Sequence, residues 1–438
     1  YIAAWDLHLK NPKGKAKITS KRPLKTKEDL AYVSPTGDDD NDGTLASPFA
    51  TFARAASATA NSAFPKIILR EGDYREKLDF GNFSVFTKKV TVTNYRLEKV
   101  RFMGSLSITG WTKTTGYTNV YEATLSNALT LHGSNLNKYV IFEDGNPSKP
   151  ITESERHPLQ AGLTHRLPYT ELLNEDFDTD LGTTLTALDA SGGGHYHDTG
   201  NNKIFLVTSD NDNPETNDYS YEYAYTSVVA SPTIDKHLDL DLIGIESWYA
   251  KGNGMTLSNF NNITRKNCRV FGSTSDGFKD SVNRLVAYRD EAAGVGNDGQ
   301  NGHVYDVSGW EDSDLRQGVN QAYYFNSWCH DNYDDGMSHH ERGEVFTYGG
   351  LYEYNGDRGI APSNSCIMEC HQPFVRKNGQ LVGVDGGTVG HGLSIVNAPD
   401  AGDGRYNSSL IAYGAQLIEN TVGAAIQNTA GHKMLLVD

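Results

Sequence analysis

The chain has only four cysteines in 438 residues, too few for a scaffold held by disulfides. Cys268 and Cys329 precede two regularly spaced glycines, and we expect them to face inward as small core residues. No apolar run approaches the length of a membrane-spanning helix, and the N-terminus does not read as a signal peptide. The sequence therefore predicts no membrane insertion.

Basic residues are also scarce, with 39 Lys and Arg against 55 Asp and Glu and a net charge of −16. Nucleic acids and anionic membranes select basic surfaces, so this balance argues against both as partners. It suits a soluble protein that acts outside the cell. Helical periodicity is rare as well, whereas glycine occurs 44 times and Asn, Asp, Thr and Tyr are frequent. This composition is typical of an all-β protein with many turns.

A repeat becomes visible where glycine precedes an apolar residue. Gly254, Gly277, Gly336 and Gly359 each stand in this position, and the first pair and the second pair are both 23 residues apart. A short apolar or aromatic strand and a polar turn come before each glycine. Self-similarity at this period indicates a solenoid, and short strands with Asn, Gly and Asp corners indicate a parallel β-helix.

Equivalent residues of such a solenoid stack about 5 Å apart on neighbouring coils. Three columns flank the glycines: Asn253, Asp276, Asp335 and Arg358 directly before them, Lys279 and Ser338 two residues after, and Leu257, Asp280, His339 and Pro362 three after. Asp and Asn before glycine are ordinary corner residues. The density of ionisable groups on two coils nevertheless favours function, because buried like charges are costly. We therefore predict the active site here.

The same pattern divides the chain into four parts. We expect an N-terminal arm or linker over 1–31, a cap with the first coils over 32–111, a β-rich insertion over 112–235 and the main β-helix over 236–438. The excess between the second and third glycine, roughly 281–318, is predicted to be a long loop beside the active site. The C-terminal end has no polar cap, which suggests that more chain or a partner follows.

Glycoside hydrolysis needs one protonated and one ionised carboxyl group. If their coils are adjacent, Asp276 and Asp335 lie about 5 Å apart, and their like charges separate the two pKa values. Asp334 and Glu341 are further candidates. Arg358 would keep Asp335 ionised. Two more residues, His339 and His340, would position the substrate or share the proton.

β-Elimination from a uronic-acid polysaccharide is the alternative. It needs a cation to neutralise the substrate carboxylate and a base to remove the α-proton. Asp276, Asp334 and Asp335 would bind calcium in that case, and Lys279 or His339 would be the base. Under hydrolysis we expect no cofactor.

Sugar binding draws on aromatic and polar side chains. The candidates are Tyr333, Trp310, His330 and Arg342, together with the Arg358 and His340 named above. Each of the aromatic residues can equally pack within a coil. A non-catalytic adhesin that binds a glycan is therefore the rival from another functional class.

Three parts of the sequence resemble known families. The motif YVSPTG…DGT…SPFATFARA (32–55), followed by KIILREGDYREKLDF (66–80), resembles the opening of pectate-lyase-like right-handed β-helix proteins, which implies that fold with a capping helix. The stretch SWCHDNYDDGMSHHE (327–341), followed by GGLYEYNGDRGI (349–360), resembles bacteriophage tailspike depolymerases. That resemblance implies a homotrimer that cuts capsule, exopolysaccharide or lipopolysaccharide chains. The DGFK at 276–279 is similar to β-helix lyases with a lysine base and an aspartate-bound calcium.

Overall fold

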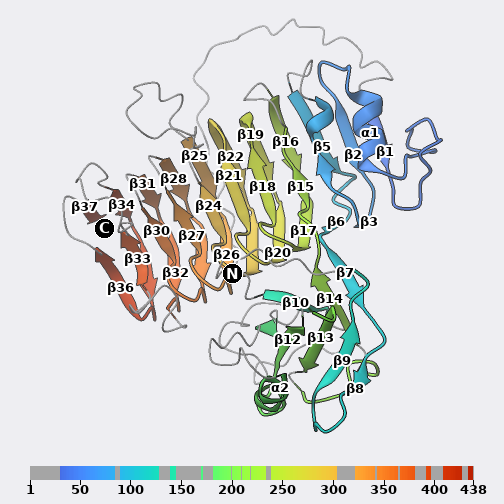
Figure 1. The fold of residues 1–438 in the computed structure, drawn as a ribbon. Coiled ribbons are helices and arrows are strands. Elements are labelled where there is room, and N and C mark those ends of the chain that lie inside the picture. The colour runs from blue at the N-terminus through green and yellow to red at the C-terminus, as the bar shows by residue number, and fades with distance from the viewer. Residues whose placement is uncertain are drawn as a thin grey trace, which may run out of the picture.

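A computed structural model provides the structure of the chain (Figure 1). It describes the following residues: 30–83, 89–127, 139–144, 169–170, 181–198, 200–208, 210–217, 219–232, 238–302, 321–340, 343–363, 366–379, 391–395, 408–426 and 433–437. The predicted arm at 1–31 falls almost entirely outside these residues. Within the described ranges, no helix is long and apolar enough to cross a lipid bilayer.

Three long parallel sheets form a right-handed parallel β-helix, which confirms the predicted fold class. Among the described residues, sheet 1 has eleven strands: β1 (Leu30–Val33), β2 (Lys66–Leu69), β5 (Lys89–Asn94), β16 (Leu238–Ile243), β19 (Phe260–Lys266), β22 (Arg284–Tyr288), β25 (Gln321–Phe325), β28 (Glu344–Tyr348), β31 (Ile367–His371), β34 (Ser409–Tyr413) and β37 (Lys433–Val437).

Sheet 2 contains β3 (Gly72–Tyr74), β6 (Val100–Met103), β17 (Ile245–Ala250), β20 (Arg269–Ser273), β23 (Glu291–Val295), β26 (Trp328–His330), β29 (Leu351–Glu353), β32 (Phe374–Arg376) and β35 (Gln416–Ile418). Sheet 3 contains β18 (Met255–Ser258), β21 (Phe278–Ser281), β24 (Gln300–Gly302), β27 (Met337–His339), β30 (Ile360–Pro362), β33 (His391–Ile395) and β36 (Val422–Ile426). In the main solenoid, each coil runs from sheet 1 to sheet 2 and then to sheet 3.

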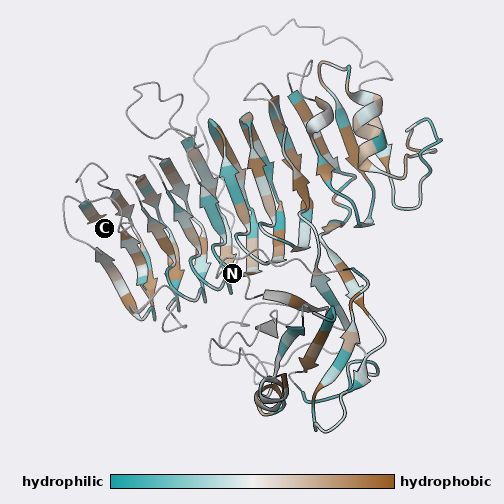
Figure 2. Ribbon diagram, viewed as in Figure 1, coloured by the Kyte–Doolittle hydropathy of each residue, from teal (hydrophilic) through white to brown (hydrophobic). Residues whose placement is uncertain are grey.

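The strands alternate buried and less buried residues, and the buried ones from all three sheets meet in one continuous core. Figure 2 shows the same alternation as apolar and polar segments along the solenoid. The helix α1 (Phe52–Thr59) packs against β1, β2 and β4 (Leu78–Asp79) at the N-terminal end of the solenoid. Thr51 caps it by accepting a hydrogen bond from the Arg54 amide at 3.1 Å. The predicted capping helix is thus confirmed.

Antiparallel strands between β6 and β16 form the β-rich insertion (Figure 1). One sheet contains β7 (Ser105–Ile108), β10 (Tyr139–Asp144), β11 (Tyr169–Thr170) and β14 (Ser220–Ala224); the other contains β8 (Thr112–Lys113), β9 (Tyr121–Thr124), β12 (Gly194–Asp198) and β13 (Lys203–Val207). A helix, α2 (Leu181–Asp189), packs on β12 and β13, and β15 (Val229–Ala230) pairs with β4. Where the domains begin and end stays a prediction.

An asparagine ladder explains part of the glycine repeat. At the corner between sheets 2 and 3, the Asn332 side chain donates to Asn355 and the Asn355 side chain to Asn378, both at 2.8 Å. A Cβ atom on Gly336 would lie 2.7 Å from Nδ2 of Asn355 and 2.6 Å from the Gly359 carbonyl oxygen. Only glycine fits there, because the amide ladder and the next coil already fill the space. At Gly277 the carbonyl oxygen of the next coil alone comes as close, without an asparagine.

One prediction about the solenoid is wrong. The stretch 281–318 was expected to be a long loop, but its first part forms a complete coil with β22, β23 and β24. Gly299 occupies the repeated glycine position there, 22 residues after Gly277. The residue after Gly299 is Gln300. Its side chain is fully buried but polar, so this coil does not show the pattern of a glycine followed by an apolar residue. Residues 303–318 lie outside the described part of the chain.

Candidate active site

Four charged residues stand directly before the repeated glycines on successive coils. Backbone hydrogen bonds join the Gly277 amide to the Asp298 carbonyl at 2.8 Å, Gly299 to Asp335 at 2.9 Å and Gly336 to Arg358 at 2.8 Å. The order along the solenoid is therefore Asp276, Asp298, Asp335 and Arg358. The prediction that Asp276 and Asp335 are neighbours is wrong, because the coil of Asp298 lies between them and puts them roughly 10 Å apart.

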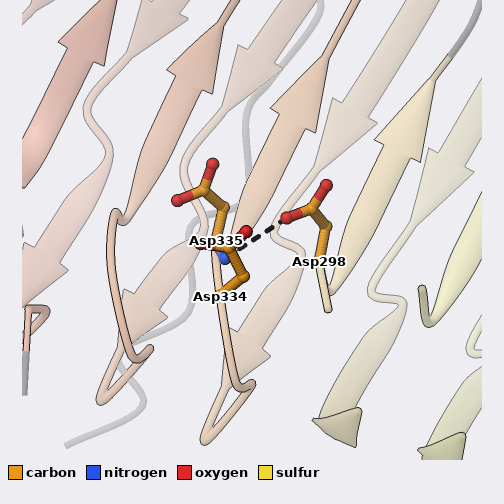
Figure 3. Close-up of side chains that lie close together, drawn as sticks. All are labelled: Asp298, Asp334 and Asp335. Atoms are coloured by element: carbon orange, nitrogen blue, oxygen red, sulfur yellow. Dashed lines mark hydrogen bonds between the residues drawn. The ribbon is translucent and has the colours of Figure 1, made fainter. Parts of the chain in front are cut away.

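Asp298 lies at the centre of this column and is only 4% exposed. Its carboxylate accepts hydrogen bonds from the Asn301 side chain at 2.8 Å and from the Asp335 amide at 3.3 Å (Figure 3). Burial, and then the neighbouring carboxylates of Asp335, Asp334 and Asp276, raise the pKa of Asp298 well above its usual range. Both effects favour the protonated form of Asp298, which is the form that a general acid needs.

Asp335 is 2% exposed but has a cationic partner. Its Oδ1 accepts the Arg358 amide at 2.9 Å, and its Oδ2 lies 3.2 Å from the guanidinium Nη1. The other end of that guanidinium contacts Asp357 at 2.8 Å. A guanidinium at this distance stabilises the ionised carboxylate. Asp298 and Asp335 thus have contrasting environments although they stand on adjacent coils.

Asp334 completes a cluster of three buried carboxylates. Asp298, Asp334 and Asp335 each offer an oxygen atom within 4.8 Å of the other two (Figure 3). Three hard oxygen donors at this spacing fit a divalent cation such as calcium, in which case they would be its ligands. The predicted calcium set is similar, with Asp276 in the place that the structure gives to Asp298.

Asp276 forms the edge of the cluster toward the N-terminus. Its Oδ1 accepts a hydrogen bond from Asn297 at 2.6 Å, and its Oδ2 lies 3.4 Å from the Lys279 ammonium. Lys279 points outward from β21, and its side chain is one third exposed. Both residues therefore lie at the predicted site, where the lysine is ion-paired with Asp276.

The column three residues after the glycine faces the interior of the solenoid. Leu257 of this column belongs to the core, and Asp280 binds the fully buried Arg265 at 2.7 Å. His339 is 1% exposed, and its Nε2 lies 3.0 Å from the Tyr324 hydroxyl. Gly302 of the preceding coil leaves room for the imidazole, since a Cβ there would lie 2.1 Å from its Nδ1. We therefore do not include His339 in the catalytic set.

His340 points in another direction and joins two serines. Its Nε2 lies 2.9 Å from the hydroxyl of Ser338, and its Nδ1 lies 2.7 Å from that of Ser363 on the next coil. Ser338 shares the outward column of Lys279 and stands beside Asn301, the hydrogen-bond partner of Asp298. His340 is thus linked to the aspartate cluster only through Ser338 and Asn301, and its predicted role with the substrate stays a prediction.

The remaining predicted residues lie elsewhere or outside the described chain. Tyr333 packs against an apolar cluster on sheet 2 that contains Phe271 and Ala293. His330 lies on the outer face of the same sheet, between Asp331 at 2.6 Å and Glu291 at 3.3 Å. Burial opposes its charge, but these two carboxylates raise the pKa of His330 to about 9. Glu341, Arg342 and Trp310 are not among the described residues.

Sequence reasoning missed Asp298, Asn297 and Asn301. The signal was present, because Asp298-Gly299 repeats the Asp-Gly pair of Asp276-Gly277 after 22 residues. The repeat was defined as a glycine followed by an apolar residue, whereas Gly299 is followed by the polar Gln300. A search on Asp-Gly alone would have found the coil.

Comparisons with known proteins agree with the fold. No protein-family model matches the sequence. A solved structure of XylC with xylose matches with a TM-score of 0.57 and 14% identity, over 93% of this chain and 69% of that one. A solved glycoside hydrolase matches with a TM-score of 0.51 and 11% identity, over 93% and 96%. At these identities the likeness shows a shared β-helix fold, in line with the resemblance found in the sequence.

Two further similarities are limited in extent or quality. An uncharacterized Bacillus subtilis (strain 168) protein, YwoF, is 41% identical over 76 residues, which span 17% of this chain and 16% of that protein. The tailspike gp49 from Pseudomonas phage LKA1 matches with a TM-score of 0.20, too low to support an argument. The chain is thus similar to β-helix proteins in fold, and its chemistry has to be argued from its own residues.

Proposed function

We propose that this protein is a glycoside hydrolase that cleaves a bacterial surface or extracellular polysaccharide at internal bonds. The single observation that carries the proposal is the contrast between two adjacent buried carboxyl groups. Asp298 lies among like charges and has a raised pKa, whereas Asp335 is ion-paired with Arg358. Glycoside hydrolysis needs this pair, one group to protonate the leaving oxygen and one to act as a carboxylate.

Asp298 is the general acid in this proposal, and Asp335 is the nucleophile or base. The close approach of their oxygen atoms, within 4.8 Å, is shorter than the roughly 6.5 to 9.5 Å that an intervening water requires. We therefore expect retention of the anomeric configuration. Inversion in freshly formed product, followed by proton NMR, would instead assign the two roles to Asp276 and Asp335, which stand two coils apart.

The position of the cluster favours internal cleavage. The aspartates lie in the middle of the solenoid, and coils with β18 and β21 continue on one side and coils with β30 and β33 on the other. An extended glycan can pass the cluster in both directions, whereas a site that removes terminal sugars is closed at one end. Mixed products of several lengths early in the reaction are the expected outcome.

A polysaccharide lyase is the second candidate function, and the carboxylate cluster is the observation that favours it. Calcium on Asp298, Asp334 and Asp335 would supply the charge that holds a uronate beside them. Without a cation, four aspartates face Lys279 and an arginine that is already paired, so an acidic glycan meets net repulsion. Hydrolysis of a neutral glycan is therefore the preferred reading.

The test is a panel of neutral and acidic bacterial polysaccharides, incubated with and without calcium or a chelator. New reducing ends without ultraviolet absorbance support hydrolysis. Reducing ends together with absorbance from an unsaturated uronate, lost with the chelator, would transfer the site to the lyase reading. Binding without either signal on any substrate would support a non-catalytic adhesin.

Action outside the cell and assembly as a homotrimer belong to the same proposal, and the resemblance of the DDG-x-S-x-H motif (334–340) to tailspike depolymerases supports them. Light scattering of the purified full chain tests the trimer directly. A monomeric mass at all concentrations used in the activity assay would remove that part of the proposal and leave the catalytic part intact.

A further inference from the structure

Beside the aspartate cluster lies a second chain of groups with acid–base potential, and the proposed hydrolysis does not use it. The Ser338 hydroxyl lies 2.9 Å from Nε2 of His340, and Nδ1 of the same imidazole lies 2.7 Å from the Ser363 hydroxyl. Both serines are 4% exposed, while the imidazole is half-buried. A hydroxyl within reach of a base, with a third group orienting that base, is the arrangement that activates a serine nucleophile.

The hydrogen bonds are compatible with the tautomer that a general base needs. The Ser363 hydroxyl lies 3.4 Å from the His339 carbonyl oxygen and can donate to it, which leaves the hydroxyl oxygen to accept. In that arrangement Nδ1 of His340 donates to Ser363, and the unprotonated Nε2 accepts from the Ser338 hydroxyl. This tautomer can take up a proton from Ser338.

The surroundings favour charge separation in this pair. Asn301 stands beside Ser338 in the strand register and donates its amide to Asp298, so the carboxylate cluster is close by. Negative charge nearby stabilises the imidazolium that forms when the serine gives up its proton. On the other side of Ser338 in the strand register stands Ala361, a residue with a small side chain.

We propose that Ser338 is a nucleophile activated by His340, with Ser363 as the orienting residue, and that this site hydrolyses esters of small acyl groups on sugar hydroxyls. The Ser338 Oγ attacks the ester carbonyl carbon while its proton moves to Nε2 of His340. The bond from that carbon to the sugar oxygen breaks, and the sugar oxygen takes the proton. Water then attacks the acyl-serine, gives a proton to Nε2 and releases the carboxylic acid, and Oγ regains its proton.

The chemical class of the substrate follows from the location. The buried position of Ser338 limits the acyl group to a small one, and the adjacent aspartates disfavour an anionic one. Bacterial polysaccharides that pass the cluster would bring an uncharged acyl ester within reach. The esterase proposal does not depend on Asp298 as a general acid, since no step passes through it, so either activity can fail alone.

The experiment labels the folded full chain with a fluorophosphonate, which reacts with an activated serine by displacement of fluoride. We expect peptide mapping to find the adduct on Ser338, with no adduct there in Ser338→Ala. His340→Ala should slow labelling by about 100-fold or more, which is the usual contribution of a general base. Ser363→Ala should slow it less, and Ser363→Thr should restore it because the hydroxyl returns.

Ser281→Ala in β21 is the matched control, because this serine lies in the same sheet away from His340 and its loss should leave labelling unchanged. Circular dichroism of each variant checks folding. Two results would overturn the proposal: no adduct on Ser338 in the folded wild type while a known serine hydrolase is labelled in parallel, or labelling of Ser338 at an equal rate in folded His340→Ala. Release of acetate from 4-nitrophenyl acetate that is equal in wild type and Ser338→Ala would do the same.

Discussion

Two groups of buried charges lie on neighbouring coils and differ in the direction in which they face. The inner group lies within the solenoid, where Arg265 binds Asp290 through Nε and Asp280 through Nη1, both at 2.7 Å. The outer group lies at the corner between sheets 2 and 3 and contains Asp298 and Asp335. Burial raises the pKa of carboxyl groups in both groups.

The difference between the groups lies in how the negative charge is balanced. Inside, one guanidinium touches both carboxylates and also stacks 4.0 Å above the Phe278 ring, so every contact serves the fold. Outside, Asp298 has carboxylates as its nearest charged neighbours, an arrangement that folding alone would not favour. Carboxyl groups that crowd one another at the corner therefore indicate chemistry, whereas carboxyl groups that share a guanidinium in the core indicate structure. Four experiments test this contrast, from the largest expected effect to the smallest.

Removal of the inner cation should have the largest effect on stability. In Arg265→Met, Asp280 and Asp290 stay buried without a partner, and we expect the free energy of unfolding to fall by about 3–5 kcal/mol. Chemical denaturation measures it. Arg269→Met, at a side chain that is half exposed and paired with Glu291, is the control and should change stability by less than about 1 kcal/mol. Equal stability of Arg265→Met and wild type would show that the inner group is not structural.

Neutralising Asp298, the proposed general acid of the outer group, should lower activity and not stability. Asp298→Asn keeps the size of the side chain but cannot donate the proton, so kcat/KM should fall by about 10³-fold. Its stability should stay equal or rise, because a group beside like charges is neutralised. Initial rates of new reducing ends and a denaturation curve give both values. Full activity in Asp298→Asn would refute its role as the general acid. Asp239→Asn on sheet 1 is the control variant, and it should keep full activity.

The pH dependence of stability should reflect the inner group, whereas the pH dependence of activity should reflect the outer group. Burial raises the pKa of Asp290 to about 6 from the 3.8 of an unfolded chain, so the folded protein holds a proton that the unfolded chain has lost between these values. Stability should therefore decline as the pH rises from about 4 to 6, by up to about 3 kcal/mol. Denaturation at several pH values tests it. The decline should disappear in Asp290→Asn, and an identical slope in that variant would contradict the assignment.

The smallest effect concerns the edge of the outer group. Asp276 is the last of three carboxylates that raise the pKa of Asp298. In Asp276→Asn that pKa should fall, and the high-pH limb of kcat/KM should move to lower pH by less than about one unit. A shift to higher pH would contradict the proposed coupling. A rate loss as large as that of Asp298→Asn would instead assign Asp276 a direct catalytic role.

Much of the site followed from local patterns. The DNYDDG stretch (331–336) and the Asp-Gly at 276–277 led to the correct corner of the solenoid, because a corner that lies this close to the carbonyl oxygen of the next coil has to be glycine. The inward direction of His339 was also predictable. Side chains alternate along a strand, so the third residue after the glycine faces the same way as the apolar first one. The prediction placed all three columns beside the glycines on one surface and so overlooked this alternation.

The sequence by itself determined the coil: strands with period-two burial, a glycine at the corner and a capped helix at the start. Each of these depends on contacts within a few residues or on a repeated steric requirement. Only the tertiary structure decided which coils are neighbours. The spacing of 37 residues from Gly299 to Gly336 conceals that their coils stack directly, since a solenoid accepts inserts of any length between strands without changing the register. Stacking placed Asp298 beside Asp335, and burial there, rather than any local motif, raises its pKa.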